Sequence, residues 1–477
     1  MKRLTGQKIL KEGFFVKKFK KGLALSLALA MGLSLVACGG KEEATTTAAS
    51  AADDTTAAAA DDADTTAATE EAATMEAPGT DGEKIYVYSW NSELGDIIDK
   101  EFKTKYPEYA DLIENVNLGV GGTSDEYKTA VENAITGAGD QYPSIIAMDT
   151  DMAKHFMESS YTANLYDLGI TDAMYAEAYQ YTKDHAMIDG QLKGLSWQAT
   201  PGCFCYRADI AAEVLGSDDP AKVQEAVKDW DAFFATADQM KAAGYSMLSG
   251  PDDVKYLYIN NKQGAWVADG KLNIDASVNE YLETNKKLYD GGYTNKSSMW
   301  DDAWSSGFDG KVFGYFGCTW FVYWSINSVD HKGDWRICAG PVDYFWGGSY
   351  LAVGKDTPNP ELAAFIAYTL CCDTDFMYEH MKSTFDYVNN KSAVQKCIDN
   401  GEGASDMLGG QNPVEIWAAQ ADKIVNAYAT SYDMTFNGYM DAAALAYSSG
   451  EAATVEDAIE IIKNKVAESY GDVITVE

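Results

Sequence analysis

The sequence predicts an α/β protein of two lobes joined by a multi-strand hinge. From Lys84 onward, short runs of β-branched and aromatic residues alternate with segments of helical periodicity, a pattern typical of parallel sheets. The 394 residues from Lys84 to Glu477 are too many for one ordinary core of ~150–250 residues. We therefore expect two lobes.

The first 37 residues have the features of an export signal. Eight basic residues and one acidic residue precede Gly22, and the uncharged residues 22–37 are too few to span a bilayer comfortably as a helix. The run ends in Leu35-Val36-Ala37-Cys38, which resembles the lipobox of bacterial lipoproteins. That resemblance implies a lipid on Cys38 and an extracytoplasmic protein anchored to the outer face of the cell membrane. An ordinary secretory signal with a chance cysteine is the alternative.

Residues 38–83 are predicted to form a disordered tether. Of the 43 residues from Lys41 to Glu83, 37 are Ala, Thr, Asp or Glu, and none is aromatic. Such a segment has too little apolar surface to offset the entropy lost on ordering. The tether does not discriminate between functions, because an enzyme or an adhesin could use the same arrangement.

The charge balance argues against nucleic acid and against an anionic ligand. The chain has a net charge of −36, and removal of residues 1–37 would lower it by seven to −43, which repels phosphate backbones. Beyond residue 37 the arginines are Arg207 and Arg336, although bidentate arginines are the preferred partners of carboxylates and phosphates. Six tryptophans lie between Trp300 and Trp346, and flat aromatic rings suit the apolar faces of sugars. A neutral ligand is expected.

The cysteines do not suggest a disulfide framework. Seven remain if Cys38 is lipidated, which is an odd number, and a chain of this length needs no disulfides for stability. Neither the cysteine spacing nor the four scattered histidines matches a zinc ligand set. The thiols are predicted to be small core hydrophobes, and no metal is expected.

The beginning of the folded region predicts where a ligand would bind. A strand at 84–90, a helix that Ser92 caps, a strand near Val116, a helix at about 123–135 and a strand at 144–148 follow one another. In such sheets ligands bind beyond the carboxyl ends of the strands. Those ends carry Trp90, Asn91, Asp149 and Asp151. The alternative is that Asn91, Ser92 and Asp151 only cap helices.

Five segments, taken together and in order, carry a family resemblance. They are Gly194–Asp209, which ends in Tyr206-Arg207-Ala208-Asp209, then Asp229-Trp230-Asp231, Gly310–Trp320, Trp346–Ser349 and Ser449–Ile459. They resemble the inter-lobe crossing, a helix start, a strand-then-tryptophan motif, a glycine-rich return strand and the closing helix of extracellular solute-binding proteins for carbohydrates, the maltose-binding protein group. The resemblance covers most of the chain after Lys84. It implies a periplasmic-binding-protein-like fold with a ligand cleft between the lobes. If the chain crosses between the lobes near residues 199, 340 and 375, each lobe is discontinuous and a multi-strand hinge joins them. The lobes would then be residues 84–198 with 340–375, and residues 199–339 with 376–477.

The resemblance also implies a function and its residues. The protein would be a monomer, without catalytic residues or cofactor, that delivers a neutral mono- or oligosaccharide to the permease subunits of an ABC importer. The implied ligand-binding residues are Trp90, Asn91, Asp149 and Asp151 of the first lobe, Thr200 at the hinge, the stacking Trp320, the return-strand residues Trp346, Gly347 and Ser349, and Asn437 on a late helix. Core packing is the alternative for Trp320 and the better explanation for Phe436 and Asn437. The maltose binder has an aromatic residue where this chain has Asn437, which implies a different sugar.

Two rival functions remain open at this stage. A lipid-anchored glycoside hydrolase would also use aromatic residues, but Asp301-Asp302 or Asp149 with Asp151 are too close in sequence to face each other across a scissile bond. No nucleophile-elbow, zinc-protease, phosphate-loop or dinucleotide motif stands in an interpretable context. An adhesin or sensor that holds sugar without transport is compatible with the same sequence.

Overall fold

The computed structural model describes residues 73–137, 139, 141–326, 331 and 333–477. In this part of the chain the residues pack around two hydrophobic cores. The first core includes Ile85, Phe102, Ile145, Leu351 and Phe365 and surrounds a five-stranded sheet. The second core surrounds a three-stranded sheet and includes Phe204, Phe233, Leu282, Tyr344 and Phe436. The predicted α/β fold class is confirmed.

The five-stranded sheet has the order β2-β1-β3-β12-β6. Its strands are β1 (Ile85–Ser89), β2 (Ile113–Asn117), β3 (Pro143–Asp149), β12 (Ser349–Val353) and β6 (Leu195–Ser196). Strand β1 pairs in parallel with β2 and β3, whereas β12 runs antiparallel to β3 and β6. The first three strands thus have the parallel arrangement that the alternating pattern predicts.

Helices that follow these strands pack against the first core. They are α1 (Glu93–Ile97), η1 (Ile98–Phe102), α2 (Lys103–Lys105), η2 (Pro107–Leu112), α3 (Asp125–Thr136), α4 (Thr150–Met157), η3 (Leu165–Leu168), α5 (Gln180–Ala186) and α12 (Pro360–Cys371). Ser92 occupies the predicted N-cap position of α1, but its side chain makes no capping hydrogen bond. The Asn91 Oδ1 accepts one from the Glu93 amide at 3.0 Å instead.

The three-stranded sheet is antiparallel and has β7 (Gly202–Arg207) at its centre. Strands β10 (Gly314–Cys318) and β11 (Trp335–Cys338) pair with its two edges. Two small hairpins, β4 (Met187–Ile188) with β5 (Gln191–Leu192) and β8 (Val267–Ala268) with β9 (Lys271–Leu272), lie outside both sheets.

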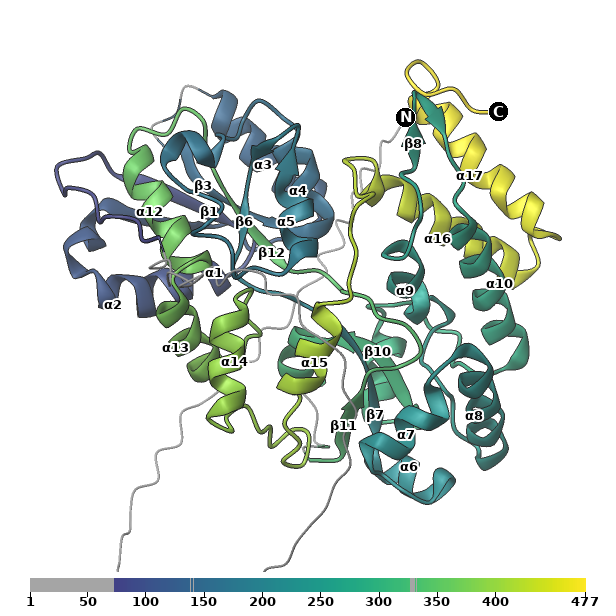
Figure 1. Ribbon diagram of the computed structural model, residues 1–477. Helices are drawn as coiled ribbons and strands as arrows, with labels where there is room; N and C mark the ends of the chain where they lie inside the picture. The colour runs from purple at the N-terminus through teal and green to yellow at the C-terminus, as the bar shows by residue number, and fades with distance from the viewer. Residues whose placement is uncertain (1–72, 138, 140, 327–330, 332) are drawn as a thin grey trace, which may run out of the picture. The chain divides into compact units, whose positions relative to one another are not determined.

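Helices predominate over strands after β7. Figure 1 shows α6, α7 and α8 near β7, and α10, α16 and α17 side by side. Besides α12, the described helices after β7 are α6 (Ala208–Leu215), α7 (Pro220–Val227), α8 (Trp230–Ala243), η4 (Pro251–Val254), α9 (Lys255–Ile259), α10 (Ala276–Gly291), α11 (Asp302–Ser305), η5 (Ser306–Phe308), η6 (Phe321–Ser325), α13 (Thr374–Thr384), α14 (Lys391–Asp399), α15 (Val414–Ala421), α16 (Asp433–Ser449) and α17 (Val455–Tyr470).

Three segments lie side by side where the chain passes between the cores. The Ala199 amide donates to the Tyr387 carbonyl at 2.9 Å, and the Trp346 amide donates to the Thr200 carbonyl at 3.1 Å. The Gly202 amide donates to the Tyr344 carbonyl at 2.7 Å. These bonds hold a multi-strand connection together. The lobe bounds derived from the sequence stay a prediction.

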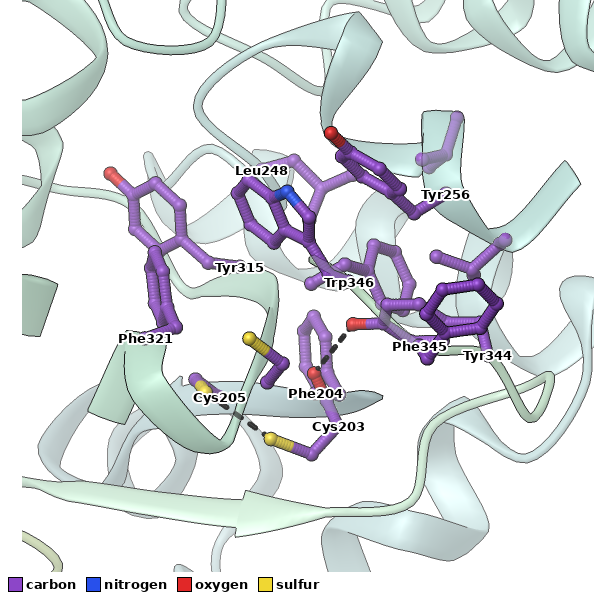
Figure 2. Packing of buried hydrophobic residues seen from close by; sticks show 14 of the residues in the cluster. Cys203, Phe204, Cys205, Leu248, Tyr256, Tyr315, Phe321, Tyr344, Phe345 and Trp346 are labelled. Carbon is purple, nitrogen blue, oxygen red and sulfur yellow. Dashed lines mark hydrogen bonds between the residues drawn. The ribbon is translucent and has the colours of Figure 1, made fainter. Parts of the chain in front are cut away.

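All seven described cysteines are free and buried. Cys203 and Cys205 lie on one face of β7 with their Sγ atoms 3.6 Å apart, and the Tyr344 hydroxyl donates to the Cys203 carbonyl beside them (Figure 2). They pack as small apolar side chains among aromatic residues. Cys38 lies outside the described residues.

The end of the predicted tether contacts the first core. Met75 packs against that core, the Tyr109 hydroxyl donates to the Pro78 carbonyl, and the Asn359 amide donates to the Glu83 carbonyl. Residues 75–83 therefore form part of the folded region, because these contacts offset the cost of ordering that the composition suggests. Among the described residues, no helix is long and apolar enough to cross a membrane.

Candidate ligand-binding cleft

A cavity of about 540 Å³ lies between the two cores. Its volume is within the ~300–1,000 Å³ range of small-molecule sites. Residues from both cores line it: Trp90, Asn91, Glu93, Gly121, Gly122, Thr123, Asp149, Asp151, Gln198, Tyr256, Trp300, Trp320, Trp324, Ser325, Trp346, Gly347, Gly348 and Ser349. We call this cavity the cleft.

Strand ends of the five-stranded sheet supply the polar wall of the cleft. Asp149 is the last residue of β3, and its Oδ1 accepts from the Asp151 amide at 3.0 Å at the start of α4. Asn91 follows β1 in the same way. The Asn91 side chain therefore has both roles that the sequence left as alternatives, because it accepts from the first amide of α1 and also lines the cleft. Asp151 lines the cleft but does not cap α4, whose N-cap is Asp149.

The indole ring of Trp90 is held in place by close neighbours. It meets the ring of Tyr127 edge to face, with centroids 5.8 Å apart. A Cβ atom on Gly122 would lie 2.9 Å from the indole, so the backbone at that position can approach only as glycine. The ring therefore has a defined place at the rim of the first core.

The second core supplies an aromatic wall. Trp346 stacks on Tyr256 with ring centroids 4.9 Å apart and on Phe321 at 6.0 Å (Figure 2). The Trp320 indole donates to the Trp346 carbonyl at 2.9 Å, and its ring lies 6.0 Å from Trp300 at an interplanar angle of 17°. Trp346 is only 4 % exposed, whereas Trp300 is 60 % and Trp324 65 % exposed. The wall thus runs from a buried ring to freely accessible ones.

The turn between Trp346 and β12 depends on glycine. Gly347 and Gly348 have φ angles of +68° and +102°, which side chains with a Cβ rarely adopt. The hydroxyl of Thr150 donates to the Gly347 carbonyl at 2.8 Å, and the hydroxyl of Thr200 donates to the same carbonyl at 3.0 Å. Thr200 is buried behind the turn and positions it.

Asn437 lies outside the cleft. Its Oδ1 accepts from the indole of the buried Trp266 at 2.9 Å, and it borders a separate cavity of about 30 Å³. Phe436 is fully buried in the second core. The structure therefore brings together eight of the ten predicted ligand-binding residues, places Thr200 behind them, and leaves Asn437 in the packing of α16.

The cleft is acidic. Among the described lining residues, Glu93, Asp149 and Asp151 carry carboxylates and none is a lysine, arginine or histidine. Burial, followed by the charge of Asp386, raises the pKa of Glu93 to about 7. Burial and the charge of Asp151 raise the pKa of Asp149 to about 7. Burial also raises the pKa of Asp151, although Lys255 and the Tyr256 hydroxyl act in the opposite direction.

The two described arginines are occupied elsewhere. The buried Arg207 forms a bidentate pair with Asp209, with N–O distances of 2.9 and 2.6 Å. Arg336 donates to the Gly333 and Trp335 carbonyls. Among the described residues, no group of His, Cys, Asp or Glu side chains could hold a metal ion.

Several lining residues escaped the sequence analysis. Trp300 and Trp324 belong to the tryptophan cluster that the composition singles out, so that cluster could have identified them. Gln198 lies within the crossing segment, where its amide donates to Glu93 at 2.8 Å. Tyr256 carries no local signal, because only the packing of α9 against Trp346 brings it to the cleft.

Residues 100–406 match the family model described as bacterial extracellular solute-binding protein. The chain belongs to this family. The match covers more than half of the sequence, and it includes both sheets except the first strand. A protein of this family binds a solute outside the cytoplasm, which agrees with a cleft between two cores. No curated protein matches the chain significantly.

Solved structures share the two-lobed fold. A binding protein of an ABC transporter from Bifidobacterium animalis subsp. lactis Bl-04, in complex with β-1,6-galactobiose, has 21% identity and a TM-score of 0.63, over 83% of this chain and 100% of its own. The galacto-N-biose-/lacto-N-biose I-binding protein from Bifidobacterium longum has 14% identity and a TM-score of 0.64, over 84% and 100%. The sugar-binding protein MalE from Xanthomonas citri has 16% identity and a TM-score of 0.62, over 81% and 96%.

Proposed function

We propose that this protein is a lipid-anchored receptor that captures a neutral carbohydrate and delivers it to the permease subunits of an ABC importer. The observation that carries the proposal is the cleft itself, in which an aromatic wall faces a wall of carboxylate and amide groups. Sugars need both surfaces, because one face of a pyranose ring is largely apolar C–H and its rim carries hydroxyl groups. The sugars in the complexes of similar fold support the same ligand class.

The polar groups of the cleft suit hydroxyl donors. The carboxylates of Glu93, Asp149 and Asp151 accept hydrogen bonds, and the Asn91 and Gln198 amides can both donate and accept. Because none of the described lining residues is a lysine, arginine or histidine, these carboxyl groups would disfavour a sugar acid or sugar phosphate. The electrostatics therefore favour a ligand without negative charge.

The support for the lipid anchor comes from the sequence. Leu35-Val36-Ala37-Cys38 follows an uncharged run, and Ala/Thr-rich residues separate it from the folded region. A lipid on Cys38 would keep the receptor near its permease, and such tethering raises the effective concentration of one for the other.

The test is a thermal-shift and calorimetric screen of the purified protein. The panel contains glucose, galactose and xylose, with the di- and trisaccharides of the α-1,4-glucose, β-1,6-galactose and β-1,4-xylose series. A bound sugar should raise the melting temperature and perturb tryptophan fluorescence, with weak dependence on salt because no ion pair forms. Tightest binding to an anionic ligand, with a steep salt dependence, would contradict the proposal. Release of reducing sugar on prolonged incubation would favour the glycoside-hydrolase alternative.

A further inference from the structure

A second cavity of about 180 Å³ adjoins the cleft and shares Glu93, Trp320 and Trp324 with it. We call it the side cavity. Its other lining residues come from α1 and η1, from η6 and from α13 and the loop that follows: Asp96, Ile97, Lys100, Glu101, Tyr323, His380, Thr384 and Asp386. The side cavity is thus formed between the same two cores as the cleft.

The polar groups of the side cavity are held in fixed positions. The His380 Nδ1 lies 3.0 Å from Glu101, and its Nε2 lies 3.5 Å from Asp386. Burial alone would lower the pKa of His380, but hydrogen bonds to Asp386 and Glu101 and their charges outweigh it and raise the pKa to about 10. The imidazole thus lies between two carboxyl groups, with a hydrogen bond to Glu101 and an ion-pair distance to Asp386.

One side chain links the two cavities through hydrogen bonds. The Gln198 amide nitrogen donates to Glu93 at 2.8 Å and to Asp386 at 3.0 Å, and its oxygen accepts from the Ser349 hydroxyl at 3.3 Å. A single polar chain thus runs from the turn at the back of the cleft to the side cavity. The aromatic wall continues in the same direction, because Trp320 and Trp324 line both spaces.

The size of the side cavity decides what it can hold. At about 180 Å³ it falls below the ~300 Å³ at which small-molecule sites begin, so it is too small to be an independent site. Its lining combines indole rings with carboxylates, as the lining of the cleft does, and adds Lys100 and His380. A small space of this kind that adjoins the cleft suits a further unit of a ligand that is bound in the cleft.

We infer that the ligand is an oligosaccharide, with one sugar unit in the cleft and the next in the side cavity beside Trp324. This inference rests on the proposed function and adds the length of the substrate to it. Trp324 is 65 % exposed, a costly position for an indole that only packs, and a sugar ring across it would bury that surface.

The experiment compares ligands of increasing length by isothermal titration calorimetry. The probes are the mono-, di- and trisaccharides of the α-1,4-glucose, β-1,6-galactose and β-1,4-xylose series. In the series that binds, the wild-type protein should bind the disaccharide at least about tenfold more tightly than the monosaccharide. Thr384→Trp places a bulky side chain at an exposed position that lines only the side cavity, and it should abolish that tenfold gain.

A matched pair of tryptophans provides the control. Trp324→Ala should weaken disaccharide binding several-fold more than monosaccharide binding. Trp300 is similarly exposed but lines only the cleft, so Trp300→Ala should weaken both ligands by the same factor. Because both side chains are mostly exposed, these variants should fold even if Thr384→Trp does not.

The outcomes separate this inference from the proposed function. Equal affinity for mono- and disaccharide in the wild type, or equal losses for both ligands in Trp324→Ala, overturns the oligosaccharide inference and leaves the sugar receptor standing. Failure of every sugar in the panel to bind overturns both.

Discussion

At the scale of single residues, Trp320 is the side chain whose role can be isolated most cleanly. Its indole is hydrogen-bonded to the Trp346 carbonyl and stacked near Trp300, so its face is held ready for a ligand. Trp320→Ala should lower the affinity for the best sugar by about thirtyfold, roughly 2 kcal/mol. The measurement is calorimetric titration.

Trp230 provides the contrasting variant. It packs against Phe233, Tyr258 and Phe316 in the second core, away from the cleft. Trp230→Ala should therefore lower the free energy of unfolding by about 3 kcal/mol and leave the affinity nearly unchanged. Equal affinity losses in the two variants would refute the site described above.

The pKa of Glu93 makes a second residue-scale prediction. Burial and Asp386 raise this pKa from 4.5 to about 7, so the folded protein binds more protons than the unfolded chain between these values. The stabilising contribution is fully present below about pH 4.5 and is lost as the pH rises through 7. Glu93→Gln keeps an acceptor for Gln198 but does not titrate.

The check is denaturant unfolding at pH 4.5 and pH 6.5. The loss of stability between these values should be smaller in Glu93→Gln than in the wild type, by an amount on the order of 1–3 kcal/mol. His380, whose pKa is about 10, loses its contribution only above its unfolded value of 6.5, so it does not interfere. The exposed Glu126→Gln should behave as the wild type, and an identical response in Glu93→Gln would show that Glu93 is not a perturbed group.

At the scale of structural elements, the turn of Gly347 and Gly348 joins the aromatic wall to the sheet. A Cβ on Gly348 would lie 3.2 Å from the Thr150 hydroxyl and 3.3 Å from that of Thr200, at a φ of +102°. Gly348→Ala should therefore destabilise the protein by about 1 kcal/mol or more and also weaken sugar binding. Differential scanning calorimetry and titration measure the two effects.

A glycine in a helix gives the opposite expectation. Gly438 lies in α16 and is exposed, and nothing would lie within 4 Å of an added Cβ. Gly438→Ala should stabilise the protein by about 0.5–1 kcal/mol without changing affinity, because alanine is the better helix former. If Gly348→Ala and Gly438→Ala both destabilised the protein, the effect of Gly348→Ala would not show that the turn is specially constrained.

At the scale of the whole molecule, Cys38 is predicted to decide where the receptor resides. Expressed in a bacterium with its leader, the protein should partition with membranes and carry an acyl mass on Cys38 after cleavage. Cys38→Ser should remain unprocessed or unlipidated, because the acyl group is attached through the cysteine thiol. Intact-mass analysis that found cleavage at another site and no acyl group would contradict the anchor.

Much of the fold could be predicted from the sequence because its signals are local. The alternation of strands and helices after Lys84 predicts parallel strands, and parallel strands place Trp90, Asn91, Asp149 and Asp151 at one edge. The hydrophobic periodicity of a segment predicts its secondary structure without information about distant residues. The sequence by itself therefore determined the fold class and the part of the polar wall that lies at the strand ends, but not Glu93 or Gln198.

Only the tertiary structure decided the rest of the site, because those contacts join distant segments. Tyr256 reaches the cleft by stacking on Trp346, ninety residues later in the chain, and no local pattern records that contact. Asn437 accepts from Trp266 because of how α16 is rotated against the second core. The side cavity likewise exists only where α1, η6 and α13 meet, so the length of the ligand is a property of packing rather than of any motif.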